Sequence, residues 1–423
     1  MSKSKRSSAS KKREISPALV LRPKRDLSTL YRHLIAIGLI AGVAFLVYSN
    51  TFSVTFQFDD RPNITKNPSI QIKVFTWDSV KRLIKTINLE SIRFFSYFTL
   101  ALNYYFGEFN VFGYHLVNLI IHAFTGIILY GFLIQTFNLP SLKERYGNVS
   151  YKVALFTSLI FIAHPVQTQS VTYIVQRMAS LGGMFFVLAF LFYVQGRLVK
   201  GQRRFFCFGG AVFSYLLGVF SKENVVILPF FIALYEFYFF QNLDLSPRGR
   251  KILFILGGAL LAFVVLGLAI WGKRYYDVMI EGYKMSSFTL PERVLTQFRV
   301  VLYYVTLLIY PHPSRLNLYY DFPVSKTILD PPTTLSSIIV VLGLIAYSLW
   351  VAKKRPLLSF CILWYFGNLV IESSIFPLEM VFEHRLYLPC IGPFILFSAG
   401  MIRVIERWKE RRAMKKGLEW EKG

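Results

Sequence analysis

Two adjacent carboxylates, Asp59 and Asp60, stand in the stretch FQFDDRPNITKN (residues 56–67), directly before Arg61 and the helix-breaking Pro62. This stretch follows the first long apolar segment, within a few residues of the expected membrane surface. A carboxylate in such a place can serve as the general base that accepts a proton from a hydroxyl group. The structural alternative is a solvated turn in which Asp59 or Asp60 caps a short helix.

Further ionisable side chains stand at or inside the ends of apolar runs, where charged groups are costly unless they pair or form a site. We single out, as candidate donor-phosphate or substrate contacts, Arg61, Arg93, His164, Arg177, Lys222, Glu223, Glu383, His384 and Arg385. Structural explanations stay open for single residues: Lys222 with Glu223 as an ion pair, or His164 as a satisfied helix end. Patterns typical of proteases and NTPases, such as HExxH or a Walker glycine loop, give these two classes no support.

This set of acids and cations suits sugar transfer from a lipid phosphate. One carboxylate is enough to take the proton of a hydroxyl acceptor. A phosphate leaving group departs readily and needs cations that hold its developing charge. A glycosidase would also need a second carboxyl group as an acid, because its leaving group is poorer.

The composition indicates a polytopic membrane protein. Of 423 residues, 54% are hydrophobic, and the formal net charge is +25. We attribute this charge to basic loops and tails held in the cytoplasm, so nucleic acid is not an expected partner. The three cysteines all lie in apolar runs without a CxxC spacing, which argues against a disulfide framework or a zinc site.

The order of apolar and basic segments predicts the elements that position the candidate residues. We expect a disordered basic cytoplasmic tail at 1–32, a transmembrane catalytic domain at 33–404 and a basic cytoplasmic tail at 405–423. The first outer loop, 53–112, should carry interfacial helices at about Trp77–Ile87 and Ile92–Phe106.

The predicted fold is an all-α bundle of about 10–11 transmembrane helices. Candidate spans are residues 34–52, 114–137, 152–163, 170–195, 205–220, 223–240, 251–271, 294–310, 334–351, 357–373 and 386–404. Basic loops at 138–152, 197–204, 241–251 and 353–355 should share the cytoplasmic side with both termini. Ten spans satisfy this rule, so we expect 294–310 to be a re-entrant or surface-lying helix.

Several motifs resemble, in order, the membrane part of the transmembrane and tetratricopeptide-repeat O-mannosyltransferases and their bacterial relatives, in the GT-C superfamily. They are FDDRPNITKNPSI, RFFSYFTLALNYYFG with GYHLVNLIIHA, IAHPVQTQSVTYIVQRMASLGGMFF, FSKENVVILP, LNLYYDFPV and EHRLYLPCIG. The resemblance covers roughly residues 34 to 400 and implies a GT-C-like bundle that takes a sugar from a lipid-phosphate donor.

The resemblance also implies roles for individual residues. An acidic residue in the first outer loop is associated with catalysis in this superfamily, which here means Asp59 or Asp60. We favour Asp59 as the base and Asp60 as an orienting group, with the reverse assignment open. The basic residues of VQRMAS, SKEN and EHRLYLP are where we place contacts to the donor phosphate.

The expected reaction is inverting transfer from a polyprenyl-phosphate sugar to a hydroxyl acceptor, protein Ser/Thr favoured, on the outer or luminal side. A glycan or a lipid is the other acceptor considered, since no 34-residue repeat is visible. The location would be a bacterial inner membrane, or the ER membrane in a eukaryote. We expect no required metal, although a divalent cation at Asp59 and Asp60 with Asp321 or Glu383 stays open. The alternatives are a transporter or flippase of a lipid-linked or anionic solute, or a glycan ligase or polymerase.

Overall fold

The computed structural model describes residues 27–90, 93–244 and 247–420, and within these ranges the regular elements are all helices. The α-helices are α1 (Leu27–Tyr48), α2 (Trp77–Glu90), α3 (Phe94–Gly107), α4 (Val111–Phe137), α5 (Pro140–Tyr146), α6 (Ser150–Ala163), α7 (Thr168–Val171), α8 (Arg177–Leu198), α9 (Gln202–Val219), α10 (Leu228–Tyr235), α11 (Pro247–Met285), α12 (Leu290–Ile309), α13 (Thr333–Val351), α14 (Pro356–Leu369) and α15 (Ile391–Trp420). Short helical turns connect them: η1 (Ser49–Ser53), η2 (Arg61–Thr65), η3 (Gly147–Val149), η4 (Pro165–Gln167), η5 (Ile174–Gln176), η6 (Glu223–Ile227), η7 (Glu236–Phe240), η8 (Pro313–Arg315) and η9 (Glu383–Leu386).

The prediction of an all-α polytopic membrane protein is confirmed. Five stretches of described helix are long and apolar enough to cross a membrane: 27–53, 111–137, 174–198, 223–240 and 333–351. A sixth span results if 140–163 and 165–171, which meet at a bend of 54°, are counted as one. Such lengths match a hydrocarbon core of roughly 30 Å at a rise of about 1.5 Å per residue.

This number is below the ten or eleven spans that the sequence pattern suggested. Helix α14 has only 14 residues, about 21 Å of helix, so it is too short to cross alone. Helix α12 corresponds to the run 294–310, which we expected to be re-entrant or surface-lying, and it is not among the five. The predicted span 251–271 lies in α11, whose side chains are largely outside the described set.

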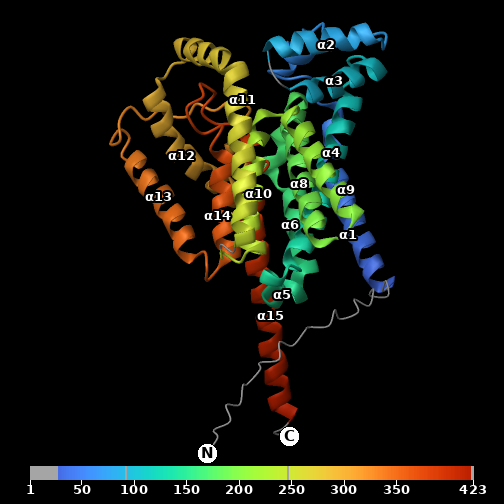
Figure 1. Ribbon diagram of the computed structural model, residues 1–423, viewed down its shortest axis with the longest axis vertical. Coiled ribbons are helices and arrows are strands. Elements are labelled where there is room, and N and C mark those ends of the chain that lie inside the picture. Colours follow the sequence, from blue (N-terminus) through green and yellow to red (C-terminus); the bar gives the residue numbers. More distant parts are fainter. Residues whose placement is uncertain (1–26, 91–92, 245–246, 421–423) are drawn as a thin grey trace, which may run out of the picture.

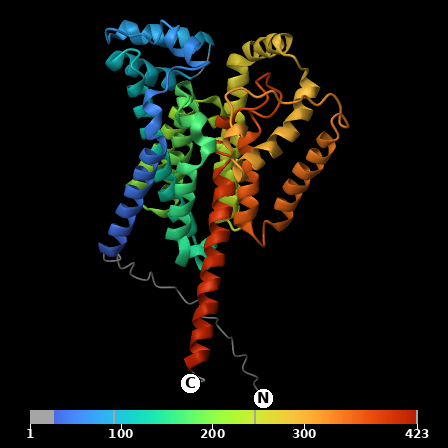
Figure 2. The ribbon, with the colours of Figure 1, turned by 180° about the vertical axis from the view of Figure 1, so that it is seen from behind.

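The spanning helices run side by side along the long axis, and α2 and α3 lie across one end of the bundle (Figure 1). They occupy the two segments for which helices were expected in the first outer loop. Helix α4 is central and contacts α1, α6 and α8, while α14 packs between α13 and α15. Seen from behind, α15 runs along the bundle and continues past its other end (Figure 2).

The described parts of the two terminal segments lie at the same end of the bundle. Helix α1 begins there and α15 ends there, together with α5 and the turn between α13 and α14 (Figure 1). Residues 1–26 of the predicted tail 1–32 lie outside the described residues. The rest of that segment, from Leu27, is helical rather than disordered. The tail from 405 continues α15 to Trp420, and 421–423 lie outside the described residues.

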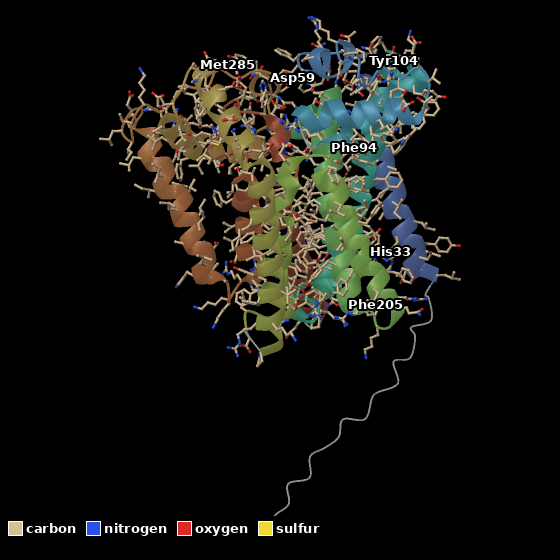
Figure 3. All side chains as sticks on the ribbon, turned by 45° about the horizontal axis from the view of Figure 1, so that its top comes forward. His33, Asp59, Phe94, Tyr104, Phe205 and Met285 are labelled. Atoms are coloured by element: carbon tan, nitrogen blue, oxygen red, sulfur yellow. The ribbon has the colours of Figure 1, made fainter. Side chains whose placement is uncertain are left out.

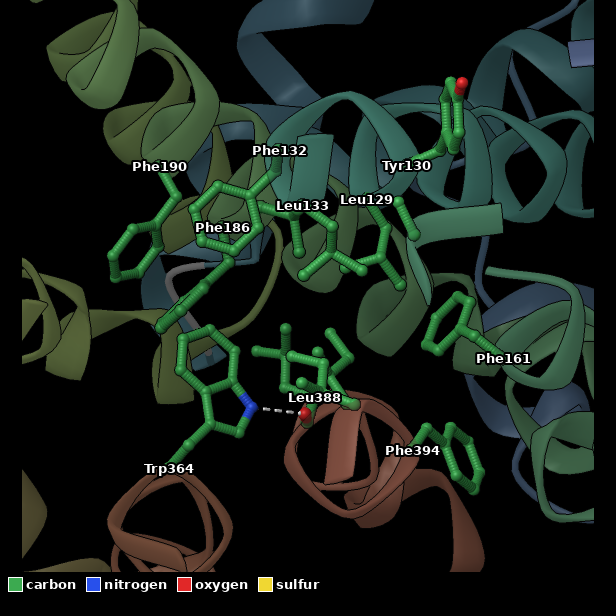
Figure 4. Close-up of a cluster of buried hydrophobic side chains, with 14 of the residues drawn as sticks. Leu129, Tyr130, Phe132, Leu133, Phe161, Phe186, Phe190, Trp364, Leu388 and Phe394 are labelled. Atoms are coloured by element: carbon green, nitrogen blue, oxygen red, sulfur yellow. Dashed lines mark hydrogen bonds between the residues drawn. The ribbon is translucent and has the colours of Figure 1, made fainter. Parts of the chain in front are cut away.

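An aromatic core holds the helices together. Phe186 and Phe190 of α8 pack against Trp364 of α14, whose indole Nε1 donates a hydrogen bond to the Leu388 carbonyl at 2.8 Å (Figure 4). Buried aromatic side chains bring large apolar area together with a fixed packing geometry. Gly183 permits a close approach here, because a Cβ would lie 2.4 Å from the Tyr387 ring. The core therefore fixes the segment just after η9 against α8.

Candidate active site

The Asp pair lies on a tight turn between η1 and η2, at the end of the bundle covered by α2 and α3 (Figure 3). Phe58 has φ of 35°, a left-handed conformation that is uncommon for a bulky side chain. The Asp60 carboxylate accepts hydrogen bonds from the backbone N–H of Gln57 at 2.9 Å and of Val175 at 2.7 Å. Asp60 therefore anchors the loop to the start of α8. Asp60 stands at the N-cap position of η2 without a side-chain capping hydrogen bond, so it does not cap that turn.

The two carboxylates have different environments. Asp60 is 1% exposed, and burial raises its pKa to about 6 although the backbone hydrogen bonds oppose this rise. Asp59 is exposed, and its backbone N–H donates to the Tyr173 hydroxyl at 2.7 Å. Burial raises the pKa of Tyr173, and the charges of Asp59 and Asp60 raise it further, so the phenol stays protonated. An accessible carboxylate is thus held beside a buried one.

Two ion pairs connect α3, η6 and the segment after α14. The Arg93 guanidinium forms a bidentate pair with Glu223, with Nε to Oε2 at 2.8 Å. Lys222 Nζ lies 2.7 Å from Glu372 Oε1, and both side chains are less than a tenth exposed. The Lys222 backbone is extended (φ −154°, ψ 133°), so successive side chains point in opposite directions. This explains why Lys222 does not pair with Glu223, the neighbour considered from sequence.

The η9 turn places three candidate residues together. Glu383 is buried and accepts hydrogen bonds at one oxygen from the Asn317 N–H, at 2.8 Å, and from the Tyr320 hydroxyl. Burial raises the Glu383 pKa to about 7, against the lowering effect of these two donors. The His384 N–H donates to Gln169 Oε1 at 3.1 Å, and the Arg385 guanidinium donates to the Met380 carbonyl at 3.1 Å.

The cations converge around His384. Burial lowers the pKa of His384 well below its ordinary value, and the positive charges of Lys222, Arg385 and Arg93 lower it further. These three residues come from η9, the start of η6 and the start of α3, which are far apart in sequence. Three of the cations that the sequence suggested as phosphate contacts therefore lie near enough to His384 for their charges to act on it.

Three other candidates take different positions. Arg177 is fully buried and donates to Asn118 Oδ1 at 2.6 Å and to the carbonyls of Thr99 and Tyr114 at 3.1 and 3.0 Å. All these acceptors are neutral protein groups, which indicates that Arg177 joins α3, α4 and α8. Arg61 is exposed at the start of η2.

His164 ends α6. Its Nδ1 accepts from the Val166 N–H at 3.2 Å, and its Nε2 lies 3.1 Å from the Leu308 carbonyl. Both ring nitrogens thus have backbone partners, as the structural alternative of a satisfied helix end proposed.

Several residues that complete the site were not among the candidates. Tyr173, Gln169 and Tyr320 contact the candidate acids or His384, and Glu372 neutralises Lys222. Tyr173, Gln169 and Tyr320 lie within or near motifs already noticed, but an uncharged side chain gives no signal of its own; Glu372 is an acid at the end of an apolar run and did carry a signal.

Within the part of the chain that the structure describes, no group of three or more His, Cys, Asp or Glu side chains is placed to hold a metal ion. The described positions of Asp59 and Asp60 therefore offer no ready set of oxygen ligands, and a divalent ion usually takes several. Whether the reaction requires a metal stays a matter of prediction.

The chain is similar over part of its length to several protein O-mannosyl-transferases. The chain is 27% identical to human protein O-mannosyl-transferase TMTC3 over 215 residues, 49% of this chain and 22% of that protein. It is 26% identical to mouse TMTC4 over 281 residues, 58% of this chain and 37% of that protein. Human TMTC2 is 25% identical over 318 residues, 69% of this chain and 36% of that protein.

The chain thus spans less than two fifths of the length of these curated relatives. No family model matches it, and no solved structure matches it. The relatives nevertheless agree with the ordered motifs found in the sequence. The chain is therefore similar to the TMTC protein O-mannosyl-transferases, the GT-C-like proteins that its motifs resemble.

Proposed function

We propose that this protein is an integral-membrane glycosyltransferase that moves a sugar from a polyprenyl-phosphate donor to a hydroxyl acceptor. The observation that carries the proposal is the pair of unlike carboxylates: Asp59 exposed, and Asp60 buried with both oxygens hydrogen-bonded. The relatives' names add that protein is the favoured acceptor and mannose the favoured sugar.

In the proposed reaction, Asp59 takes the proton of the acceptor hydroxyl. The oxygen of that hydroxyl attacks the anomeric carbon of the donor sugar at the same time. The bond between that carbon and the phosphate oxygen breaks, and the electron pair leaves with the polyprenyl phosphate. One displacement inverts the anomeric centre. Asp60 acts as a positioning residue, because its two backbone hydrogen bonds fix the turn on which Asp59 stands.

The cations would hold the phosphate charge that develops as the bond breaks. Arg93, Lys222 and Arg385 all act on His384, so their charges overlap in one region. Glu223 and Glu372 neutralise two of them. A donor phosphate could then exchange with the Glu372 carboxylate at Lys222, which keeps the buried ammonium paired before and after donor binding.

The bilayer is the second partner in this proposal. A polyprenyl chain would enter from the membrane, and the basic loops at the opposite end of the bundle would face the cytoplasm. That orientation puts Asp59 on the periplasmic side of a bacterial inner membrane, or on the luminal side of the ER membrane. The acceptor is then a secreted or luminal protein, or a glycan.

The test is sugar transfer in reconstituted membranes from a mixed pool of polyprenyl-phosphate sugars. Wild type should release polyprenyl phosphate, and Asp59→Asn should bind donor yet transfer at a rate lowered by roughly 10²–10⁴-fold. The matched control is Asp78→Asn, since Asp78 is an exposed acid on α2 whose ion pair among the described residues is with Lys81, at 3.6 Å. Normal transfer by Asp59→Asn would exclude it as the base.

The main alternative, a transporter or flippase of a lipid-linked or anionic solute, makes the opposite prediction in the same membranes. It would move intact substrate across the bilayer without releasing polyprenyl phosphate, and Asp59→Asn would affect flux alone. A glycan ligase or polymerase would instead transfer a whole oligosaccharide, which the size of the product reveals.

A further inference from the structure

A hollow of about 780 Å³ lies at the end of the bundle opposite the Asp pair. It is bounded by α5, the segment after η7, the turn between α13 and α14, and α15. The basic side chains that line it are Arg145, Lys353, Lys354, Arg355 and Arg403, and the acidic one is Glu144. Cytoplasmic retention requires basic loops, but it does not require that three separate segments aim their charges into one hollow.

These five cations differ from Arg93 and Lys222 of the candidate active site in lacking carboxylate partners. Among the described residues, no Asp or Glu oxygen lies within ion-pair distance of any of them. Arg403 stacks on the Tyr146 ring at 4.3 Å, and its Nη2 is buried without a hydrogen-bond partner. The Arg403 guanidinium also interacts with the Tyr146 side chain, and its remaining donors can take an acceptor such as a phosphate oxygen.

The start of α14 adds to the attraction for an anion. The helix begins at Pro356, and its N-cap residue Arg355 makes no side-chain capping hydrogen bond. Uncapped N–H groups and the helix dipole favour negative charge at this position. Apolar side chains, Leu357, Leu358 and Leu396, complete the lining beside the cations.

From these features we propose that the hollow binds the phosphate-bearing headgroup of an anionic phospholipid. Five positive charges match the phosphate, and the leucines beside them match the glycerol and the first part of the acyl chains. Basic pockets between spanning helices on the cytoplasmic side are known binding places for such headgroups. The proposal concerns the surface opposite Asp59 and does not depend on the reaction proposed above.

The test is binding of phosphatidylglycerol to the full-length protein in detergent, followed as the rise in thermal midpoint with lipid concentration. The triple variant Lys353→Gln, Lys354→Gln, Arg355→Gln should bind about a hundredfold more weakly, at roughly a factor of five for each basic residue removed. The matched control removes three charges from the α8–α9 connection and the first turn of α9, with Lys200→Gln, Arg203→Gln and Arg204→Gln. That variant should bind within a factor of about three of wild type.

A steric variant tests the hollow without altering charge. Gly400 lines it, and a Cβ at this position has nothing within 4 Å. Gly400→Leu should therefore fold normally, since leucine is also a better helix former than glycine, and should weaken lipid binding by filling the hollow.

Four outcomes would overturn the proposal. The first is equal loss of binding in the α8–α9 control, and the second is unchanged binding in Gly400→Leu. The third is an equal response to zwitterionic phosphatidylcholine. The fourth is displacement of phosphatidylglycerol by millimolar inorganic phosphate, which would assign the hollow to a free phosphate compound instead.

Discussion

The buried ion pair between Lys222 and Glu372 permits a sharp test of how the cations are used. Nζ and Oε1 are 2.7 Å apart, and the two side chains are 6% and 9% exposed. Removing one member of such a pair leaves the other charge buried alone, which typically costs about 3–5 kcal/mol. Lys222→Met and Glu372→Gln should each lower the free energy of unfolding by about that amount.

The double variant should behave differently from the sum of the two changes. With both charges gone, no uncompensated buried charge is left, so it should be no less stable than the more damaged single variant. The control pair is Lys81 with Asp78, whose side chains are 59% and 84% exposed. Removing either of these should change stability by at most about 0.5 kcal/mol.

Measurements of donor affinity show whether Lys222 contacts the donor phosphate or only forms a structural ion pair with Glu372. Unfolding in mixed micelles gives the stability cycle, and retention of radiolabelled polyprenyl-phosphate sugar gives donor affinity for the folded fraction. If Lys222 holds the phosphate, Lys222→Met should lose donor affinity. Glu372→Gln should keep or improve donor affinity, because this change frees the Lys222 ammonium. Equal loss of affinity in the two folded single variants would refute the reasoning.

Three further predictions concern single side chains. Burial raises the pKa of Glu383 from 4.5 to about 7, so the folded protein binds this proton more tightly than the unfolded chain does. The resulting contribution to the free energy of unfolding is fully present below pH 4.5, and about 3 kcal/mol is lost as the pH rises to about 7. Glu383→Gln should make the free energy of unfolding less dependent on pH in this range. Tyr173→Phe removes the acceptor of the Asp59 N–H and should lower kcat roughly tenfold with donor affinity unchanged in titrations. Arg177→Met removes three hydrogen bonds, including the donor to the buried Asn118 Oδ1, and should cost about 2–3 kcal/mol in the unfolding assay; a stable variant that no longer binds donor would contradict this assignment.

Periodicity predicted the local elements well where one face of a helix is buried. The two helices expected at Trp77–Ile87 and Ile92–Phe106 appear as α2, ending at Glu90, and α3, described from Phe94 to Gly107. Apolar runs predicted the spanning helices less well, because a run alone does not give helix length. Residues 357–373 read as a span, yet α14 ends at Leu369 and the chain then turns.

The partners of the charged residues could not be predicted from the sequence. Asp60 is held by the Val175 N–H, 115 positions later, and Lys222 pairs with Glu372 rather than with its neighbour Glu223. A backbone donor has no side-chain signature, and adjacency in sequence says little about direction when the backbone is extended. The sequence therefore indicated which residues carry charge but not which charges meet.

Arg93 and Lys222 near the Asp pair differ from the cations that line the hollow, and this difference is consistent with two kinds of ligand. Near the Asp pair, Arg93 and Lys222 are paired with carboxylates, which avoids the cost of an unpaired buried charge before donor arrives. A phosphate that takes the place of the Glu372 carboxylate at Lys222 must offset the cost of leaving that carboxylate without its cation. At the other end, Lys353, Lys354 and Arg355 are exposed and without carboxylate partners among the described residues. Water solvates them without a ligand, so they suit an anionic surface that is always present, whereas the paired cations suit a substrate that comes and goes.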